Sequence, residues 1–209
     1  ALGDLICATP TLRKLSKEYG QKITVVSPIP ELFKKLEYVE ASYKSTSIDW
    51  DYFNEHYVMH NSFYLVGKKD ERGVEMKHNV MDIRQYHAVH LGFMLSKDEM
   101  KCDYIPLTDF DMELPQHYVL IHPVSTWPNR TWAAEKWMEL TQMLNDIGIH
   151  VISIGKDSSE KGFFNVDKPV FNFDIPLGMN LMNQTSISDC WHLINRAACF
   201  ITMDSGLLH

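Results

Sequence analysis

The chain has 209 residues, and 45% of them are hydrophobic, which is enough to build the core of one large domain or two small ones. Its formal net charge of -7 at pH 7, without any stretch in which Lys and Arg gather, argues against a nucleic-acid partner. The four cysteines are scattered without C-x-x-C pairing, which favours reduced thiols over a disulfide framework or a zinc site; they are Cys7, Cys102, Cys190 and Cys199.

The first residues, 1–4, have the character of a loop that follows a strand, and the last ones stop within a motif. We therefore expect the chain to lack segments at both of its ends. Thr9 is expected to cap a helix in which Pro10 takes the first position and Gly20 marks the end. A strand is predicted at 22–26.

Less regular sequence follows up to residue 117. The predicted elements are a turn at 27–30, a short helix at 31–36, strands at 57–60 and 63–66, and a helix at 79–95, whereas 40–51 shows no convincing period. His87 and His90 lie on one predicted helix, but no motif supplies further ligands, so we interpret them as structural residues and not as a metal site. The polar stretch 98–115 is the expected linker between two domains, 1–112 and 113–209.

Residues 118–155 have the pattern of a strand, a loop, a helix and a second strand. The first strand is the apolar run 118–121, and apolar residues then recur at helical spacing until Gly148; they are Trp137, Leu140, Leu144 and Ile147. The second strand, 149–154, ends at Gly155. Two strands flanking one helix are the layout of a right-handed βαβ unit in a parallel sheet.

The loop of this unit contains Ser125, Thr126 and Arg130. In parallel sheets ligands bind at the carboxyl ends of strands, and the unpaired N–H groups of a helix start favour phosphate. These residues are therefore candidates for an anion site. Spacing alone, however, favours an ordinary surface loop with an exposed arginine.

The C-terminal part continues the alternation of strands and helices. It predicts a polar loop at 156–160, a strand at 169–173, a loop at 177–185, a helix with its apolar face on 187–197 and a strand at 199–203. Ser186 and Asp189 fit the S-x-x-D pattern that caps a helix start. The last strand leads into Asp204, Ser205 and Gly206, a second place where a helix start can receive a phosphate.

Four groups of residues, in order along the chain, resemble glycosyltransferase family 9, the heptosyltransferase-like enzymes of bacterial surface polysaccharide synthesis. They are Gly3-Asp4 with Thr9-Pro10; Ile121-His122-Pro123 with Arg130-x-Trp132 and Glu135-x-Trp137; the loop 155–160; and Asn180-Leu181 with Thr185-Ser186 and Asp204-Ser205-Gly206-x-x-His209. Arg130 stands where this family often has Lys.

The resemblance implies an α/β fold of the GT-B type, in which two Rossmann-like units with mostly parallel sheets face a cleft. The first unit would hold the acceptor and the second the nucleotide-sugar donor. The implied reaction is inverting, metal-independent transfer of a heptose-like sugar from a nucleoside diphosphate to lipopolysaccharide or another surface glycan. A nucleotide-sugar 2-epimerase of the same fold and a non-catalytic nucleotide-sugar-binding protein remain as alternatives.

The resemblance also assigns roles to single residues. Asp4 would be the general base, beside Gly3 and Thr9 in the acceptor-side loop. Glu160 would contact the ribose or the base of the nucleotide. The donor diphosphate would be held by Ser125, Thr126, Arg130, Asp204, Ser205 and Gly206. Spacing alone, however, favours Asp4 as a helix cap over a catalytic role, and only the resemblance reverses this preference.

The expected partners are a nucleotide-sugar donor and a glycan or glycolipid acceptor, with no metal and no other cofactor. No apolar run approaches the length that spans a bilayer, and no signal-like segment precedes the first motif. The expected location is the cytoplasm, including the inner face of the membrane.

Overall fold

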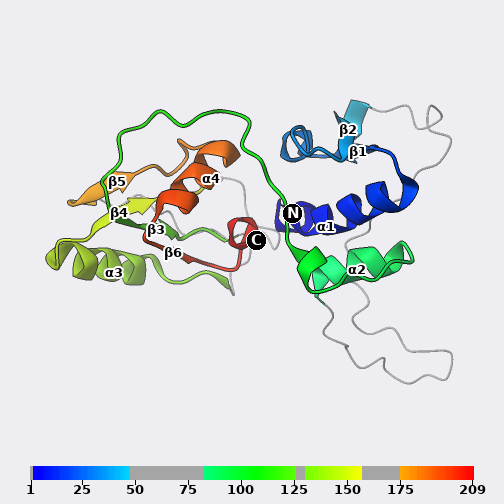
Figure 1. The fold of residues 1–209 in the computed structure, drawn as a ribbon. Coiled ribbons are helices and arrows are strands. Elements are labelled where there is room, and N and C mark those ends of the chain that lie inside the picture. The colour runs from blue at the N-terminus through cyan, green and yellow to red at the C-terminus, as the bar shows by residue number, and fades with distance from the viewer. Residues whose placement is uncertain (1, 48–81, 126–129, 157–174) are drawn as a thin grey trace, which may run out of the picture. The chain divides into compact units, whose positions relative to one another are not determined.

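Residues 2–47, 82–125, 130–156 and 175–209 are described by the computed structural model of the chain, which divides into two units, Ala1–Ile105 and Pro106–His209 (Figure 1). Helices alternate with parallel strands in both units, which confirms the predicted α/β class. Among the described residues, no helix is both long enough and apolar enough to cross a membrane. The strands predicted at 57–60, 63–66 and 169–173 lie outside the described residues.

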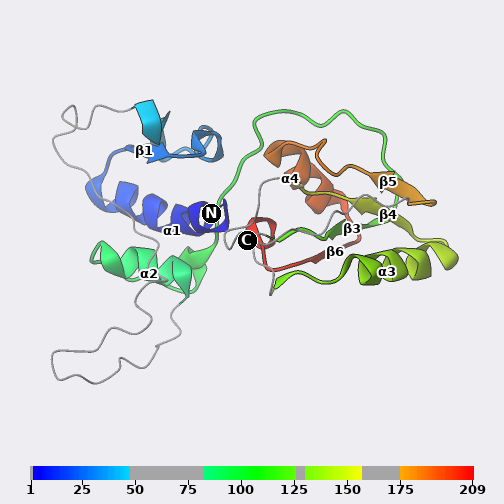
Figure 2. The same ribbon diagram turned by 180° about the vertical axis from the view of Figure 1, so that it is seen from behind.

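In its described residues, the first unit contains two helices and a pair of parallel strands. The elements are α1 (Leu2–Tyr19), β1 (Ile23–Ser27), β2 (Val39–Lys44) and α2 (Ile83–His90), with short 3-10 helices at Pro30–Leu32, Ser45–Ser47 and Asp98–Met100. Helix α1 lies between the β1–β2 pair and α2, as both ribbon views show (Figure 2). The two helices are tied together where the Thr11 hydroxyl donates to the carbonyl of Arg84 at 3.4 Å.

The predicted start of the first helix at Thr9 and Pro10 is wrong, because α1 already begins at Leu2. Proline lacks an N–H, so Pro10 cannot donate to the carbonyl of Ile6, four residues earlier. The hydroxyl of Thr9 donates to that same carbonyl at 2.7 Å and replaces the missing backbone hydrogen bond. The predicted end is confirmed: Gly20 follows the last helical residue with φ of 66°.

Other elements of this unit differ from the prediction in length or kind. The predicted helix at 31–36 is only a 3-10 turn, Pro30–Leu32, and the helix predicted at 79–95 is shortened to α2, which Asp82 caps. Strand β2 occupies part of the segment for which no element was predicted. Its burial does not alternate, because residues 41 and 42 are both half-buried and residues 43 and 44 are both exposed, so it lacks the pattern that marks a half-buried strand.

Within its described residues, the second unit contains a four-stranded parallel sheet with the order β5-β4-β3-β6. Its elements are β3 (Tyr118–His122), α3 (Ala134–Asp146), β4 (His150–Ser153), β5 (Gly178–Asn180), α4 (Ile187–Arg196), β6 (Cys199–Thr202) and a 3-10 helix, Gly206–Leu208. Strands β3 and β4 are parallel neighbours joined through α3, so the predicted strand–helix–strand unit is confirmed.

The two faces of this sheet are covered by different helices, α3 on one side and α4 on the other (Figures 1 and 2). Alternate residues of a strand point to opposite faces, so β3 contributes to both cores. Tyr118 and Leu120 pack in a cluster with Leu193 of α4, whereas Val119 and Ile121 pack in a cluster with Trp137 of α3.

Strand β5 falls in a segment that was predicted to be a loop. Gly178 pairs with Val151 of β4, and a Cβ atom at Gly178 would lie 1.8 Å from the Val151 carbonyl oxygen. The close approach of the two backbones requires a glycine with φ of 153°, a residue that by itself predicts a turn. The pairing with β4 therefore decides the conformation.

The second unit comprises Pro106–His209, and its first residues contact α4. The N–H of Leu107 donates to the Ser188 hydroxyl at 2.9 Å, and the Thr108 carbonyl lies 3.0 Å from His192 Nε2. Phe110 packs against the cluster that includes Leu193. These contacts with α4 bind residues 107–110 to the second unit.

The predicted cap of α4 is confirmed as a complete capping box. The Asp189 N–H donates to the Ser186 hydroxyl at 3.2 Å, and the Ser186 N–H donates to the Asp189 carboxylate at 2.8 Å. We expect Ser186→Ala to lower the free energy of unfolding by about 1 kcal/mol, because one N–H of the first turn loses its partner. Urea denaturation would measure this loss. Ser186→Asn, which keeps an N-cap oxygen, is the control, and an equal loss in both variants would contradict the role of the cap.

Candidate functional site

The carboxyl ends of β3 and β6 lie side by side in the second unit. The two strands are parallel neighbours in which Ile121 is opposite Ile201 and His122 is opposite Thr202. The loops that follow them therefore leave the same edge of the sheet, which is where ligands bind in parallel sheets. This edge brings together residues of two separate motifs that were predicted to bind the donor diphosphate.

Arg130 and Asp204 form an ion pair at this edge. Arg130 Nη1 lies 2.9 Å from Asp204 Oδ2, and the two side chains are 42% and 56% exposed. An exposed pair of this kind contributes only about 0–1 kcal/mol, because water screens the charges. The pair therefore orients the Arg130 guanidinium. Little free energy is lost if the guanidinium later exchanges Asp204 for another partner.

The ring of His122 holds the turn that carries Asp204 and Ser205. His122 Nδ1 lies 3.1 Å from Thr202 Oγ1 and 3.1 Å from Ser205 Oγ. Burial lowers the pKa of His122 to about 4, so the ring is neutral near pH 7. The sequence pattern places His122 in a family motif without giving it a role of its own. Its position at the end of a buried strand was the available signal for a role at the sheet edge.

The remaining predicted donor-site residues occupy different positions. Ser125 is buried directly after β3, and Gly206 opens a short 3-10 helix. Helix α3 begins at Ala134, so Arg130 reaches the edge from the loop that precedes the helix. Thr126 and Glu160 lie outside the described residues.

Gly155 lines the same edge where β4 ends. A Cβ atom there would lie 2.8 Å from Val124 Cγ2 and 3.1 Å from His122 Cδ2, and the residue has φ of 142°. Its carbonyl accepts the N–H of Asn183 at 2.7 Å. The absence of a side chain thus gives the His122 ring the room that it occupies.

In the first unit, the proposed base and its neighbours lie on a helix and not in a loop as predicted. Gly3, Asp4 and Thr9 all belong to α1, with Asp4 in its first turn. The carboxylate of Asp4 acts on His87 of α2: burial lowers the pKa of this imidazole, and Asp4 partly opposes that effect.

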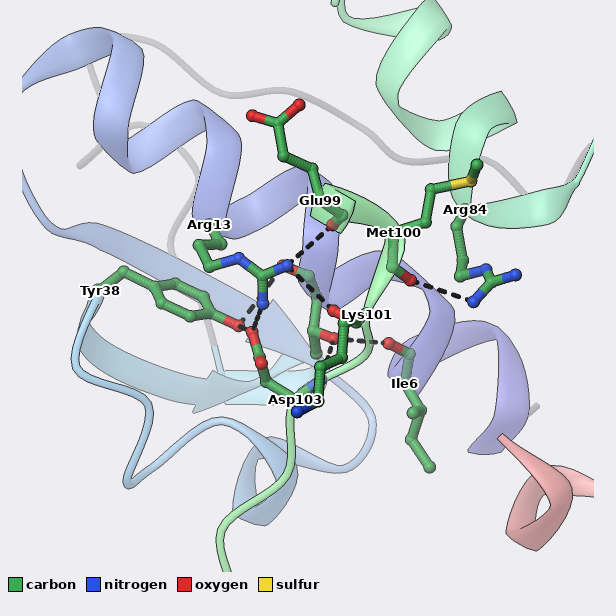
Figure 3. Close-up of polar contacts among 9 residues, drawn as sticks. Ile6, Arg13, Tyr38, Arg84, Glu99, Met100, Lys101 and Asp103 are labelled. Atoms are coloured by element: carbon green, nitrogen blue, oxygen red, sulfur yellow. Dashed lines mark hydrogen bonds and ion pairs between the residues drawn. The ribbon is translucent and has the colours of Figure 1, made fainter. Parts of the chain in front are cut away.

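A network of polar contacts holds residues 99–103 against α1 (Figure 3). The Arg13 guanidinium forms an ion pair with Asp103 and donates to the carbonyls of Glu99 at 2.7 Å and Lys101 at 2.9 Å. The Tyr38 hydroxyl donates to the Asp103 carboxylate at 2.8 Å, and burial together with this contact raises the pKa of Tyr38. One carboxylate thus joins α1 to the residue before β2.

The same segment is bound by two further contacts. The N–H of Asp103 donates to Thr9 Oγ1 at 2.8 Å, and Arg84 of α2 donates to the Met100 carbonyl at 3.0 Å. Thr9, which was predicted to line the acceptor side, therefore supports α1 from within the unit. The network stabilises the helix that carries Asp4.

His87 and His90 do not gather a set of metal ligands in the part of the chain that the structure describes, where no cluster of three His, Cys, Asp or Glu side chains occurs. His87 is buried on α2, whereas His90 is exposed and stacks on Tyr86 with ring centroids 6.1 Å apart. Packing accounts for both side chains.

The family model of glycosyltransferase family 9, described as heptosyltransferase, matches residues 45–209. No curated protein matches the sequence.

Solved structures of several heptosyltransferases have a similar fold. The dodecameric iron-containing heptosyltransferase TibC of enterotoxigenic E. coli, in complex with ADP-D-β-D-heptose, shares 16% identity and a TM-score of 0.68 over 99% of this chain and 51% of its own. E. coli ADP-heptose LPS heptosyltransferase II shares 17% identity and a TM-score of 0.65 over 100% and 78%. E. coli heptosyltransferase WaaC with ADP shares 16% identity and a TM-score of 0.57 over 99% and 79%. The chain thus spans about half the length of TibC.

Proposed function

The chain belongs to glycosyltransferase family 9, and from this premise we propose that it takes part in transferring a heptose-like sugar from a nucleoside diphosphate to a glycan acceptor. In this proposal the second unit binds the donor and the first unit supplies the acceptor side. The acceptor is a lipopolysaccharide or another surface glycan, reached from the cytoplasmic face of the membrane.

The observation that carries the proposal is the convergence of Arg130, Asp204 and Ser205 at the carboxyl ends of β3 and β6. A charge-assisted contact between a guanidinium and a phosphate contributes about 1.5–3 kcal/mol, which exceeds the 0–1 kcal/mol or so of an exposed ion pair. Arg130 can therefore exchange Asp204 for a diphosphate with a net gain. Before the donor binds, Asp204 orients the guanidinium of Arg130.

The fold neighbours support the choice of donor. TibC is described in complex with ADP-D-β-D-heptose and WaaC with ADP, both at identities that establish the fold alone. A nucleoside diphosphate with an attached sugar matches the charge at the sheet edge, because the transferred sugar leaves a diphosphate that a cation stabilises. ADP-heptose is accordingly the donor that we propose to test first.

In the proposed inverting reaction Asp4 is the general base. Its carboxylate takes the proton of the acceptor hydroxyl while the hydroxyl oxygen forms a bond to the anomeric carbon. The bond between that carbon and the diphosphate oxygen breaks on the opposite face, and Arg130 stabilises the departing charge. This assignment rests on the family resemblance; in the structure Asp4 lies in the first turn of α1.

Calorimetric titration of the purified protein with ADP, UDP and ADP-heptose tests the donor site, and a coupled assay of ADP release tests transfer. We expect ADP and ADP-heptose to bind more tightly than UDP, and ADP to be released only with a glycan acceptor. Conversion of the donor without any acceptor would favour a 2-epimerase. Donor binding without turnover on any acceptor would favour a non-catalytic binding protein.

We expect transfer to continue in excess EDTA. Arg130 and the turn at Ser205 are the contacts that we propose for the diphosphate. Arg130 supplies the positive charge that a divalent cation otherwise provides, and the turn supplies hydrogen-bond donors. The rate of ADP release, measured with and without EDTA, should agree within error. A rate that EDTA abolishes and magnesium restores would contradict metal independence.

A further inference from the structure

The protons around His122 can be assigned from the hydrogen bonds of its neighbours. A threonine hydroxyl has a single proton, and Thr202 Oγ1 lies 2.9 Å from the Met203 carbonyl oxygen, 3.1 Å from His122 Nδ1 and 3.5 Å from Ser205 Oγ. The carbonyl can only accept, so the arrangement that satisfies it takes the Thr202 proton and leaves Thr202 Oγ1 as an acceptor for His122 Nδ1. This arrangement requires the proton of the neutral ring to be on Nδ1.

This N–H is shared with the residue that opens the turn. Ser205 Oγ lies 3.1 Å from His122 Nδ1, and Ser205 immediately precedes the 3-10 helix Gly206–Leu208. The backbone adds one longer contact, in which the Met203 N–H donates to the His122 carbonyl at 3.3 Å. The ring is consequently the side chain that ties β3 to Ser205.

The surroundings of the ring leave it little freedom to turn away. His122 is 7% exposed, and its Cδ2 edge lies against Gly155, where even a Cβ atom would be only 3.1 Å distant. Rotation of the imidazole would break the contacts to Thr202 and Ser205 together. The position of the turn that carries Asp204 is therefore coupled to one tautomer of one ring.

We propose that His122, as a neutral imidazole protonated on Nδ1, is a positioning residue that holds Ser205 and the adjacent Asp204 in the geometry that binds a donor diphosphate. The proposal deepens the function proposed above and rests on it. His122 acts through Ser205 and Thr202 and needs no contact with the donor itself. A displacement of such a turn by about 1 Å can reduce the efficiency of a reacting site about 10²-fold.

The tautomer can be measured without any ligand. In long-range ¹H–¹⁵N spectra of protein labelled with ¹⁵N-histidine, an unprotonated Nε2 couples strongly to both Hε1 and Hδ2, whereas an unprotonated Nδ1 couples strongly to Hε1 alone. We expect the first pattern for His122 near pH 7. The signal is assigned by its loss in His122→Asn and by its shift in Ser205→Ala. The second pattern would overturn the proposal whatever the protein binds.

Two amide variants separate positioning from packing. His122→Asn places an amide NH₂ near the position of Nδ1, whereas His122→Gln places it near Nε2, and both lose the ring. We expect melting temperatures to fall in both variants, but ADP affinity to stay within about 3-fold of the wild type in His122→Asn and to weaken about 10-fold in His122→Gln. Equal losses of ADP affinity would overturn the proposal.

Ser205→Ala provides a variant in which the ring and the core stay intact. Loss of one hydrogen bond should weaken ADP binding about 2- to 10-fold and leave the melting temperature nearly unchanged. Unchanged ADP affinity would remove Ser205, and with it His122, from a positioning role. If the wild-type protein bound no nucleoside diphosphate at all, the proposed function would fail, while the tautomer of His122 would still be decided by the spectra.

Discussion

Asp4→Asn is expected to lower kcat by about 10²- to 10⁴-fold while the affinity for the donor stays near that of the wild type. An acceptor hydroxyl is a weak nucleophile until its proton is removed, and the amide of Asn cannot accept that proton. Asp4 lies in the first turn of α1 in the first unit, whereas the proposed donor contacts lie in the second. Single-turnover rates and calorimetric affinities, measured on the same preparations, separate the two effects.

The competing explanation is a purely structural role for Asp4. A carboxylate in the first turn of a helix interacts favourably with the helix dipole by about 0.3–1 kcal/mol, so its loss would reduce stability with little effect on the rate. Glu18→Gln is the matched control, because it removes one carboxylate from the same helix at an exposed ion pair with Lys14. A near-normal kcat in Asp4→Asn would identify a structural residue, and the base would then have to be sought elsewhere in the first unit.

Arg130→Ala is expected to weaken ADP binding by about 1.5–3 kcal/mol, or roughly 10- to 150-fold, because a charge-assisted contact to phosphate is lost. Arg130→Lys should recover part of this loss, since a point charge still attracts the diphosphate although the planar fork is absent. Isothermal titration calorimetry would measure the ADP affinity of the wild type, Arg130→Ala and Arg130→Lys. The partner Asp204 is half-exposed and remains solvated in the Ala variant, so stability should change little.

The matched control for Arg130 is Lys136→Ala. It also removes one positive charge from the second unit, at an exposed pair with Glu139 on α3. Equal affinities for ADP in the Arg130 and Lys136 variants would show that only the overall charge matters. Unchanged affinity in Arg130→Ala would remove this residue from the site.

Several features of the chain follow from local sequence. The strand–helix–strand unit from β3 to β4 is predictable because buried apolar strands and a helical apolar stripe have different periods. The capping box of α4 is predictable because Ser186 and Asp189 satisfy each other within three residues. The placement of Ser205 after a strand also indicated an edge of the sheet, although the sequence could not say which strand lies beside it.

A local contact decided the first helix: the Thr9 hydroxyl donates to the Ile6 carbonyl, three residues earlier, in place of the N–H that Pro10 lacks, and α1 continues through Pro10. A contact between distant residues decided β5. Gly178 forms a strand only because the β4 backbone approaches it more closely than any side chain would allow.

The candidate site was decided in the same way. The local sequence identifies Arg130 as a candidate cationic side chain, together with two hydroxyl-rich loops and the motifs of the family. Only the tertiary structure paired Arg130 with Asp204 and His122 with Ser205, because both pairs depend on which strands are neighbours in the sheet. The interactions differ in how far apart their residues lie in the sequence. Periodicity and capping involve residues a few positions apart, whereas strand order is set by the burial of whole faces of the sheet.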